Sequence, residues 1–185
     1  LTMGKMTFVP AELTKKAPNQ TVQNGVLAVT LNRAHPTASG DAAGTILSII
    51  RATDDYIDYA AYDTNKDGKC TQDELAILIL NSGPDRSSTA QYYNSGSPKS
   101  YFAVHGTSQP TSLTIDGVLV VSGTSGGRVC NLGEYNKPGT IMPIGVPTHE
   151  LAHNFGAEDL YHRGGHADAT WPQPYRFSLQ CDGNH

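Results

Sequence analysis

The chain has 185 residues, of which 38% are hydrophobic and 16% are charged, and its net charge is −4. This length and composition suit one compact domain, so we expect a single domain over residues 1–185, with a mixed pattern in 1–38. The charge gives no basic surface for nucleic acid, and no apolar run reaches the length that spans a membrane. We therefore expect neither nucleic acid nor membrane as a partner, and we expect a monomer.

The N-terminal part of the chain predicts one strand and one helix. Residues 25–31 (Gly-Val-Leu-Ala-Val-Thr-Leu) are its most strand-like segment. Over residues 41–53, apolar side chains recur at helical spacing, which predicts an amphipathic helix. These apolar residues are Ala42, Ile46, Ile49, Ile50 and Ala52.

Residues 63–74 have the pattern of an EF-hand-like calcium loop of twelve residues. Side chains with oxygen stand at positions 1, 3 and 5, a glycine at 6, and a glutamate that can bind through both oxygens at 12. Position 7 offers its backbone carbonyl, and position 9 offers a hydroxyl or a bridging water. The expected ligands are Asp63, Asn65, Asp67, Lys69, Thr71 and Glu74. Such residues also favour plain surface turns, but the match at every loop position predicts a structural calcium ion.

The middle of the chain predicts strands separated by loops. Residues 76–80 (Ala-Ile-Leu-Ile-Leu) form a short apolar run, which suits a buried central strand. Loops are expected at 85–100 and 122–140. Strands are expected at 101–104 and 113–121, the latter broken by a turn at Asp116-Gly117. Since helices and strands segregate without a repeated strand–helix unit, the predicted fold class is α+β.

The most specific pattern, H-E-x-x-H-x-x-G-x-x-D, begins at His149. Residues four apart lie on one face of a helix, so His149 and His153 can bind one zinc ion. Glu150 lies beside the first ligand, where it can act as general base toward a zinc-bound water. A helix is expected at about 145–155, with a proline tolerated in its first turn and Gly156 ending it. The chain can then turn back and bring Asp159 to the metal as third ligand.

Together the two motifs resemble those of secreted bacterial metallopeptidases of the immune inhibitor A type. The likeness extends over about residues 40–183 and is carried by 57–62 leading into the calcium loop, by Glu74-Leu75, and by 159–161 (Asp-Leu-Tyr). It implies an exported zinc endopeptidase that cleaves proteins or peptides. It also implies a metzincin-like catalytic domain with a mixed sheet and an active-site helix. The family spacing favours Asp159 over the adjacent Glu158 as third zinc ligand.

The chain departs from this family where a methionine is expected beneath the zinc. The counterpart segment is 178–183 (Ser-Leu-Gln-Cys-Asp-Gly), and Gln180 stands at the methionine position. A buried amide needs hydrogen-bond partners, so we expect the floor of the site to be built differently.

Three cysteines leave one unpaired if a disulfide forms within the chain. Cys130 lies in a segment predicted as loop and Cys181 beside the C-terminal turn, so these two are the preferred pair. Cys70, inside the calcium loop, is expected to be a small buried apolar residue. The alternative that all three cysteines are reduced stays open.

Two other functions fit parts of the sequence. One is a non-catalytic calcium-binding module with an inactive peptidase-like site, and the other is a zinc hydrolase acting on something other than peptides. Intact His149, Glu150 and His153 argue against the first, because a decayed peptidase usually loses its base or a ligand. Zinc content measured together with casein hydrolysis distinguishes these functions.

Overall fold

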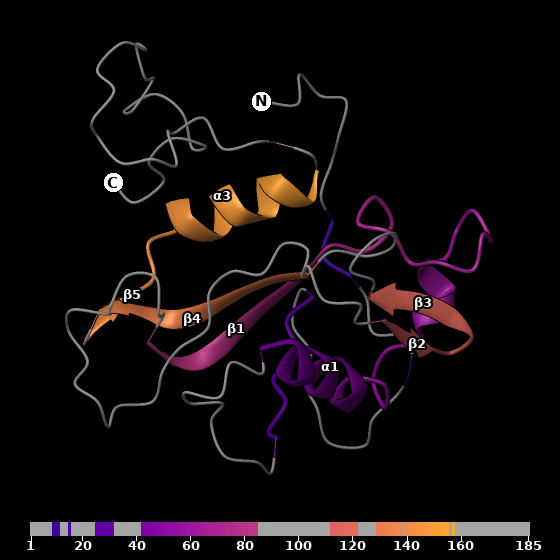
Figure 1. Cartoon of the computed structure of the whole chain (residues 1–185), viewed down its shortest axis with the longest axis horizontal. Helices are drawn as coiled ribbons and strands as arrows, with labels where there is room; N and C mark the ends of the chain where they lie inside the picture. Colours follow the sequence, from indigo (N-terminus) through magenta and orange to yellow (C-terminus); the bar gives the residue numbers. More distant parts are fainter. Residues whose placement is uncertain are drawn as a thin grey trace.

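A computed structural model describes residues 9–11, 15, 25–31, 42–84, 112–121, 129–137, 139–155 and 157. Over these residues the fold is α+β, as predicted, with a mixed sheet and two helices (Figure 1). The elements are α1 (Ala42–Ala52), η1 (Tyr59–Tyr62), β1 (Ile77–Pro84), β2 (Leu113–Ile115), β3 (Val118–Val121), β4 (Val129–Lys137), β5 (Thr140–Ile141) and α3 (Gly145–Asn154). None of the helices among these residues is long and apolar enough to cross a membrane.

The main sheet has the order β1–β4–β5, with β4 in the middle. Strand β1 runs parallel to β4, pairing Leu78 with Cys130, whereas β5 runs antiparallel to β4. Helices α1 and α3 lie on opposite sides of the β1–β4 pair (Figure 1). Both faces of β4 are therefore covered, which agrees with the burial of residues 129–133.

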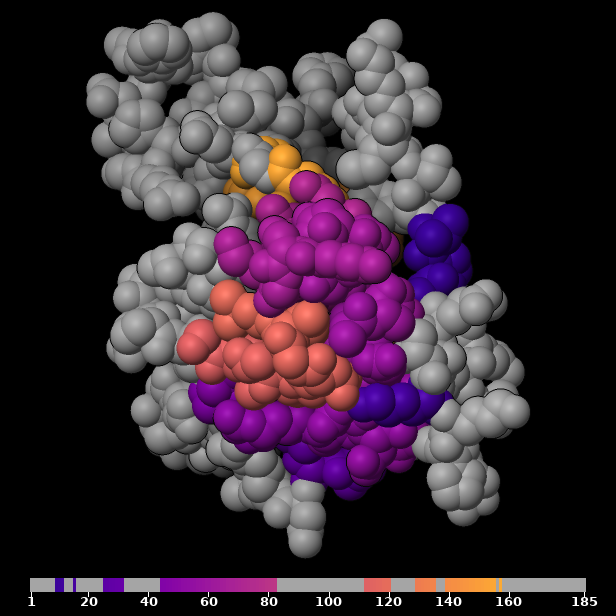
Figure 2. All heavy atoms as spheres, turned by 90° about the vertical axis from the view of Figure 1, so that its right-hand side faces the viewer, coloured from indigo at the N-terminus to yellow at the C-terminus, as the bar shows by residue number. Residues whose placement is uncertain are grey.

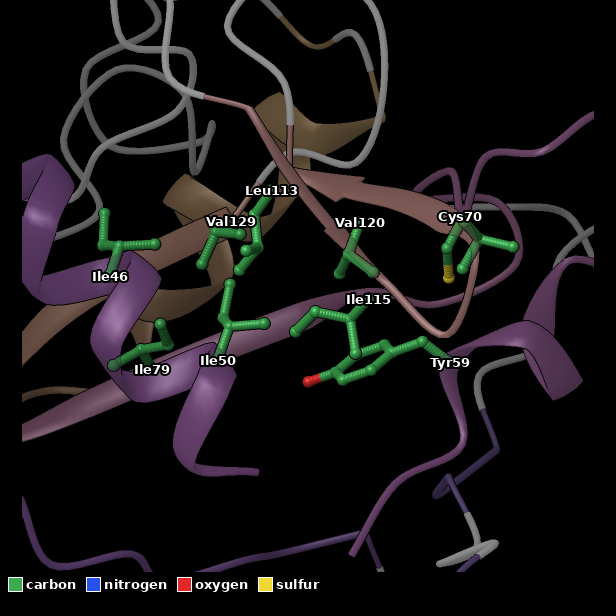
Figure 3. Packing of buried hydrophobic residues seen from close by; sticks show 10 residues of the cluster. Ile46, Ile50, Tyr59, Cys70, Ile79, Leu113, Ile115, Val120 and Val129 are labelled. Atoms are coloured by element: carbon green, nitrogen blue, oxygen red, sulfur yellow. The ribbon is translucent and has the colours of Figure 1, made fainter. Parts of the chain in front are cut away.

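The hydrophobic core joins α1, the main sheet and the β2–β3 hairpin. Ile46 and Ile50 are four apart on α1, so both point from one face of the helix into this core (Figure 3). Tyr59 is buried among them, and its hydroxyl lies 2.6 Å from the Thr53 hydroxyl. The buried members are Ile46, Ile50, Tyr59, Cys70, Ile79, Leu113, Ile115, Val118, Val120 and Val129.

The predicted Asp116-Gly117 turn is confirmed, and it fastens distant segments together. Both residues have positive φ (52° and 83°), as the tight turn of a two-residue hairpin requires. The Asp116 carboxylate accepts hydrogen bonds from the Lys15 ammonium at 3.0 Å and from the Tyr59 backbone N–H at 2.9 Å. Lys15 also contacts the Asp54 carboxylate at 2.8 Å. The hairpin is thereby tied to the N-terminal segment and to the start of η1.

Two strand predictions differ from the structure. Residues 77–84 do form a strand, but it is an edge strand of the described sheet, and Leu80 on it is 59% exposed. The central strand is β4, within 122–140, which the sequence predicted as loop. Polar residues and a glycine interrupt the apolar residues of β4, so its sequence does not predict a strand. The strand is buried because other elements pack on both of its faces. The predicted helix at 41–53 and strands within 113–121 are confirmed.

The strand expected at 25–31 is also wrong for most of its length. Gly25 lies in a turn with φ of 76°, and residues 27–31 have no regular secondary structure. Val26 is 70% exposed, so the alternating pattern here has no buried face on which a strand could pack. The predicted loop at 85–100 and strand at 101–104 lie outside the described residues.

Cys70 and Cys130 are both buried free thiols. Cys70 packs in the core, as expected for position 8 of the loop. The expected disulfide between Cys130 and Cys181 is wrong on the Cys130 side, because Cys130 is a free thiol, fully buried near the start of the central strand. Cys181 itself lies outside the described residues.

Both thiols should resist alkylation while the protein is folded. Burial, and then the charges of Glu74 and Asp63, raise the pKa of Cys70 to about 12. Burial, and then the charge of Glu150, raise the pKa of Cys130 to about 12. Since the thiolate is the reactive form, iodoacetamide at pH about 8 should modify both only after unfolding, as read by peptide mass mapping. A peptide joining Cys130 to Cys181 in the unreduced digest would contradict the free thiol.

Candidate metal centre

Helix α3 carries the H-E-x-x-H residues; it begins at Gly145, as expected, and ends at Asn154, one residue before the expected end. The Met142 N–H donates to the Glu134 carbonyl at 2.9 Å, so the segment leading into α3 is attached to β4. Pro147 lies in the first turn and is buried. The Thr148 hydroxyl and backbone N–H both donate to the Ile144 carbonyl, at 2.7 Å and 3.1 Å. The start of α3 is thus held against the sheet.

The two histidines of α3 converge on one point. Their Nε2 atoms are 3.1 Å apart, and the two rings are nearly perpendicular, with centroids 4.7 Å apart. Two nitrogens bound at about 2.0–2.1 Å to a tetrahedral ion such as zinc lie roughly 3.3 Å apart. The pair therefore fits two neighbouring corners of such a shell. Both side chains are buried, with 9% of His149 and 5% of His153 exposed.

Glu150 completes a group that can hold a metal ion. Ligand atoms of His149, Glu150 and His153 all lie within 4.8 Å of one another. Among the described residues, no other set of three His, Cys, Asp or Glu side chains comes together in this way. A group of side chains that could hold a metal ion is therefore present at His149, Glu150 and His153, built from one turn of helix.

The chain just beyond α3 returns to the second histidine. The Ala157 N–H donates to the Ala152 carbonyl at 3.1 Å, and the Ala157 carbonyl lies 2.6 Å from Nδ1 of His153. Ligand histidines in proteins usually donate their second ring N–H to such a partner. The chain therefore comes back to His153 at Ala157, whereas the turn predicted at Gly156 lies outside the described residues.

Two buried residues near this group were not predicted as part of the site. Glu150 lies close enough to Cys130 of β4 to raise the pKa of its thiol, although burial is the larger cause. Asn154 follows His153 and is fully buried, and its side-chain amide has no hydrogen-bond partner among the described residues. The sequence holds no signal for Cys130, because only the packing of α3 on β4 brings Cys130 and Glu150 together.

Several predicted residues lie outside the described part of the chain. These are Gly156, Glu158 and the expected third ligand Asp159, together with Gln180 at the methionine position. The third ligand therefore stays a prediction.

The backbone at 63–74 forms a tight turn. Lys66 and Gly68 have positive φ, of 61° and 81°, so the glycine expected at position 6 is used for the sharp bend. The Asp63 carboxylate accepts from the backbone N–H groups of Asp67 at 3.1 Å and of Gly68 at 3.0 Å. Asn65 accepts from the Asp67 N–H at 2.8 Å. These bonds orient the oxygen side chains of the loop.

Glu74 closes the loop by joining its two ends. One carboxylate oxygen accepts from the Thr64 N–H at 2.8 Å and the Asn65 N–H at 3.2 Å, and the other from the Thr71 N–H at 3.1 Å. Burial alone would raise the pKa of Glu74, but hydrogen bonds from the Thr71 and Asn65 N–H groups and from the Thr64 and Thr71 hydroxyls together lower it. Among the described residues, the carboxylates of Asp63, Asp67 and Glu74 do not converge as the His149, Glu150 and His153 side chains do. Calcium binding at this loop stays a prediction.

The far side of the loop is anchored to the β2–β3 hairpin. The Cys70 N–H donates to the Leu119 carbonyl at 3.0 Å, and the Leu119 N–H donates to the Gly68 carbonyl at 2.9 Å. Figure 2 shows the hairpin at the surface beside the purple and magenta part of the chain. Lys69 of the loop forms a parallel bridge with Leu119 of the hairpin. One strand of the hairpin therefore supports the 63–74 loop.

No family model, curated protein or solved structure matches the chain. The geometry of α3 and of the 63–74 loop is therefore what supports the functional argument.

Calcium should raise the melting temperature through the 63–74 loop. A ligand that binds only the native state adds RT ln(1 + [L]/Kd), which is about 2.7 kcal/mol at a hundredfold excess over Kd. Glu74→Gln and Asp63→Asn should each remove most of this gain. Asp73→Asn, an exposed neighbour at a position without a ligand role, is the matched control and should keep it. Calorimetry with calcium and with a chelator measures the effect, and equal responses in all three variants would rule out the loop as the site.

Proposed function

We propose that this protein is a secreted zinc-dependent endopeptidase with a metzincin-like catalytic domain, stabilised by calcium. The observation that carries the proposal is the convergence of the His149 and His153 Nε2 atoms, 3.1 Å apart, beside the Glu150 carboxylate. Two imidazoles and a neighbouring carboxylate on one helical turn form the donor set and base of zinc peptidases that carry H-E-x-x-H. Protein or peptide chains are the proposed substrates.

Each residue of the group has a separate role in this proposal. His149 and His153, with Asp159 as the expected third ligand, would hold the ion. Bound zinc supplies a Lewis acid that polarises the scissile carbonyl and makes a bound water acidic near neutral pH. Glu150 accepts the proton of the attacking water and then delivers it to the leaving amine, so one carboxylate serves both halves of peptide hydrolysis. Its half-buried position leaves it access to a substrate from solvent.

Metal content and casein hydrolysis, measured with and without a zinc chelator, test the proposal directly. We expect one zinc ion per chain and hydrolysis that the chelator abolishes and added zinc restores. Zinc without proteolysis would contradict a peptidase and favour a hydrolase of another substrate class. Protein that binds no zinc would contradict the metal centre.

Glu150→Ala should abolish hydrolysis without removing the metal. Loss of a positioned general base typically costs a factor of about 10²–10⁴ in rate. Because the histidines remain, we expect zinc stoichiometry to stay at one per chain by elemental analysis. Glu134→Ala, which removes a half-buried carboxylate from β4, is the control and should keep activity. If Glu150→Ala loses zinc together with activity, Glu150 is a ligand and its role as base is wrong.

Asp159→Ala should weaken zinc binding far more than Glu158→Ala does. A catalytic zinc uses three protein ligands, so the loss of one leaves only the two histidines on the ion. Competition with a chromogenic chelator gives the dissociation constants of both variants. The reverse order would show that the chain beyond Ala157 presents Glu158 to the metal.

A further inference from the structure

We infer that the backbone carbonyl of Ala157 is a positioning group of the metal centre, fixing His153 in the tautomer that presents Nε2 to the ion. The inference rests on the metal-binding role proposed above for the two histidines. It goes further by assigning which ring nitrogen carries the proton before any metal is bound. It also makes the end of α3 part of the site.

The first step is the contact between His153 and Ala157. A carbonyl oxygen can only accept, so the 2.6 Å contact to Nδ1 requires the ring to donate from Nδ1. In the neutral ring the other nitrogen, Nε2, then carries a lone pair. His153 is only 5% exposed, so little water competes for either nitrogen. The hydrogen bond to Ala157 therefore holds the neutral ring in the tautomer with its proton on Nδ1, without any need for a bound metal.

The second step is what holds the carbonyl in place. Residue 157 donates its own N–H to the Ala152 carbonyl at 3.1 Å, a bond from the sixth residue back to the first that commonly ends a helix. His153 follows Ala152 directly in the chain. The bond that closes the helix and the bond that orients the ligand therefore share residue 157, so a change in the helix end moves the ligand ring.

The third step is the consequence for the other histidine. A 3.1 Å contact between two ring nitrogens needs a proton on one of them, and the Nε2 of His153 has none in this tautomer. In the metal-free protein, Nε2 of His149 is therefore the donor. The two histidines thus differ in protonation. Nε2 of His153 already has a lone pair for the ion, whereas Nε2 of His149 must lose its proton when the ion binds.

Ring nitrogen NMR of the metal-free wild-type protein tests the assignment without any change to the fold. Long-range correlations between ring nitrogens and carbon-bound protons identify the protonated nitrogen of each histidine, and the signals missing in His153→Gln assign residue 153. We expect the His153 proton on Nδ1 and an unprotonated Nε2. A proton on Nε2 of His153 would overturn the inference.

A pair of variants tests the link to the helix end. Ala157→Pro removes the N–H that holds residue 157 to Ala152, whereas Ala157→Ser keeps it. Loss of a partner that orients a ligand typically costs about 10–100-fold in metal affinity, so we expect a loss of that size for the proline variant only. Equal zinc affinities in the two variants would overturn the link. If the His153 proton lies on Nδ1 but the protein shows no proteolysis, this inference holds and only the peptidase proposal is contradicted.

Discussion

The structure depends on strand β4 being covered on both faces. On one side Val129 packs in the core formed with α1, and on the other side Leu132 and Cys130 are buried where α3 packs on the strand. A strand with no solvent face leaves little freedom to the elements on either side of it. The position of α3, and hence of the two histidines, is therefore fixed by the same packing that builds the core.

Features set by spacing within one short segment could be predicted from the sequence. The four-residue interval places His149 and His153 on one side of α3, and Gly68 forms the bend of the 63–74 loop. Strand β4 could not be predicted, because its polar residues are satisfied by distant partners. The Asn131 side chain accepts from Asn81 at 2.6 Å, across the β1–β4 pair. Strand β1 was predicted to be central because its residues are apolar, but it lies at an edge of the described sheet. An apolar composition does not determine how many neighbouring strands pair with a strand.

The two metal motifs are connected through the sheet. Glu74 closes the 63–74 loop, β1 begins at Ile77, and β1 pairs along its length with β4, on which α3 packs. Closing the loop orders the entry to β1 and so favours the β1–β4 pairing. The hairpin that supports the loop at Leu119 also belongs to the core around α1. An ion at the loop would thus act on the stability of the sheet, while peptide chemistry would stay at α3.

Covalent reach indicates which residues directly beyond the helix could supply the proposed third ligand. The Ala157 carbonyl lies 2.6 Å from the His153 ring, so the chain has already returned to the metal group at this residue. Two further residues span at most about 7 Å, which keeps the carboxylates of both Glu158 and Asp159 within reach of the Nε2 atoms. Reach alone does not choose between them. If the chain continues in an extended conformation, successive side chains point to opposite sides, so only one of the two could face the histidines. The direction of the chain beyond Ala157 would then determine which carboxylate completes the proposed site.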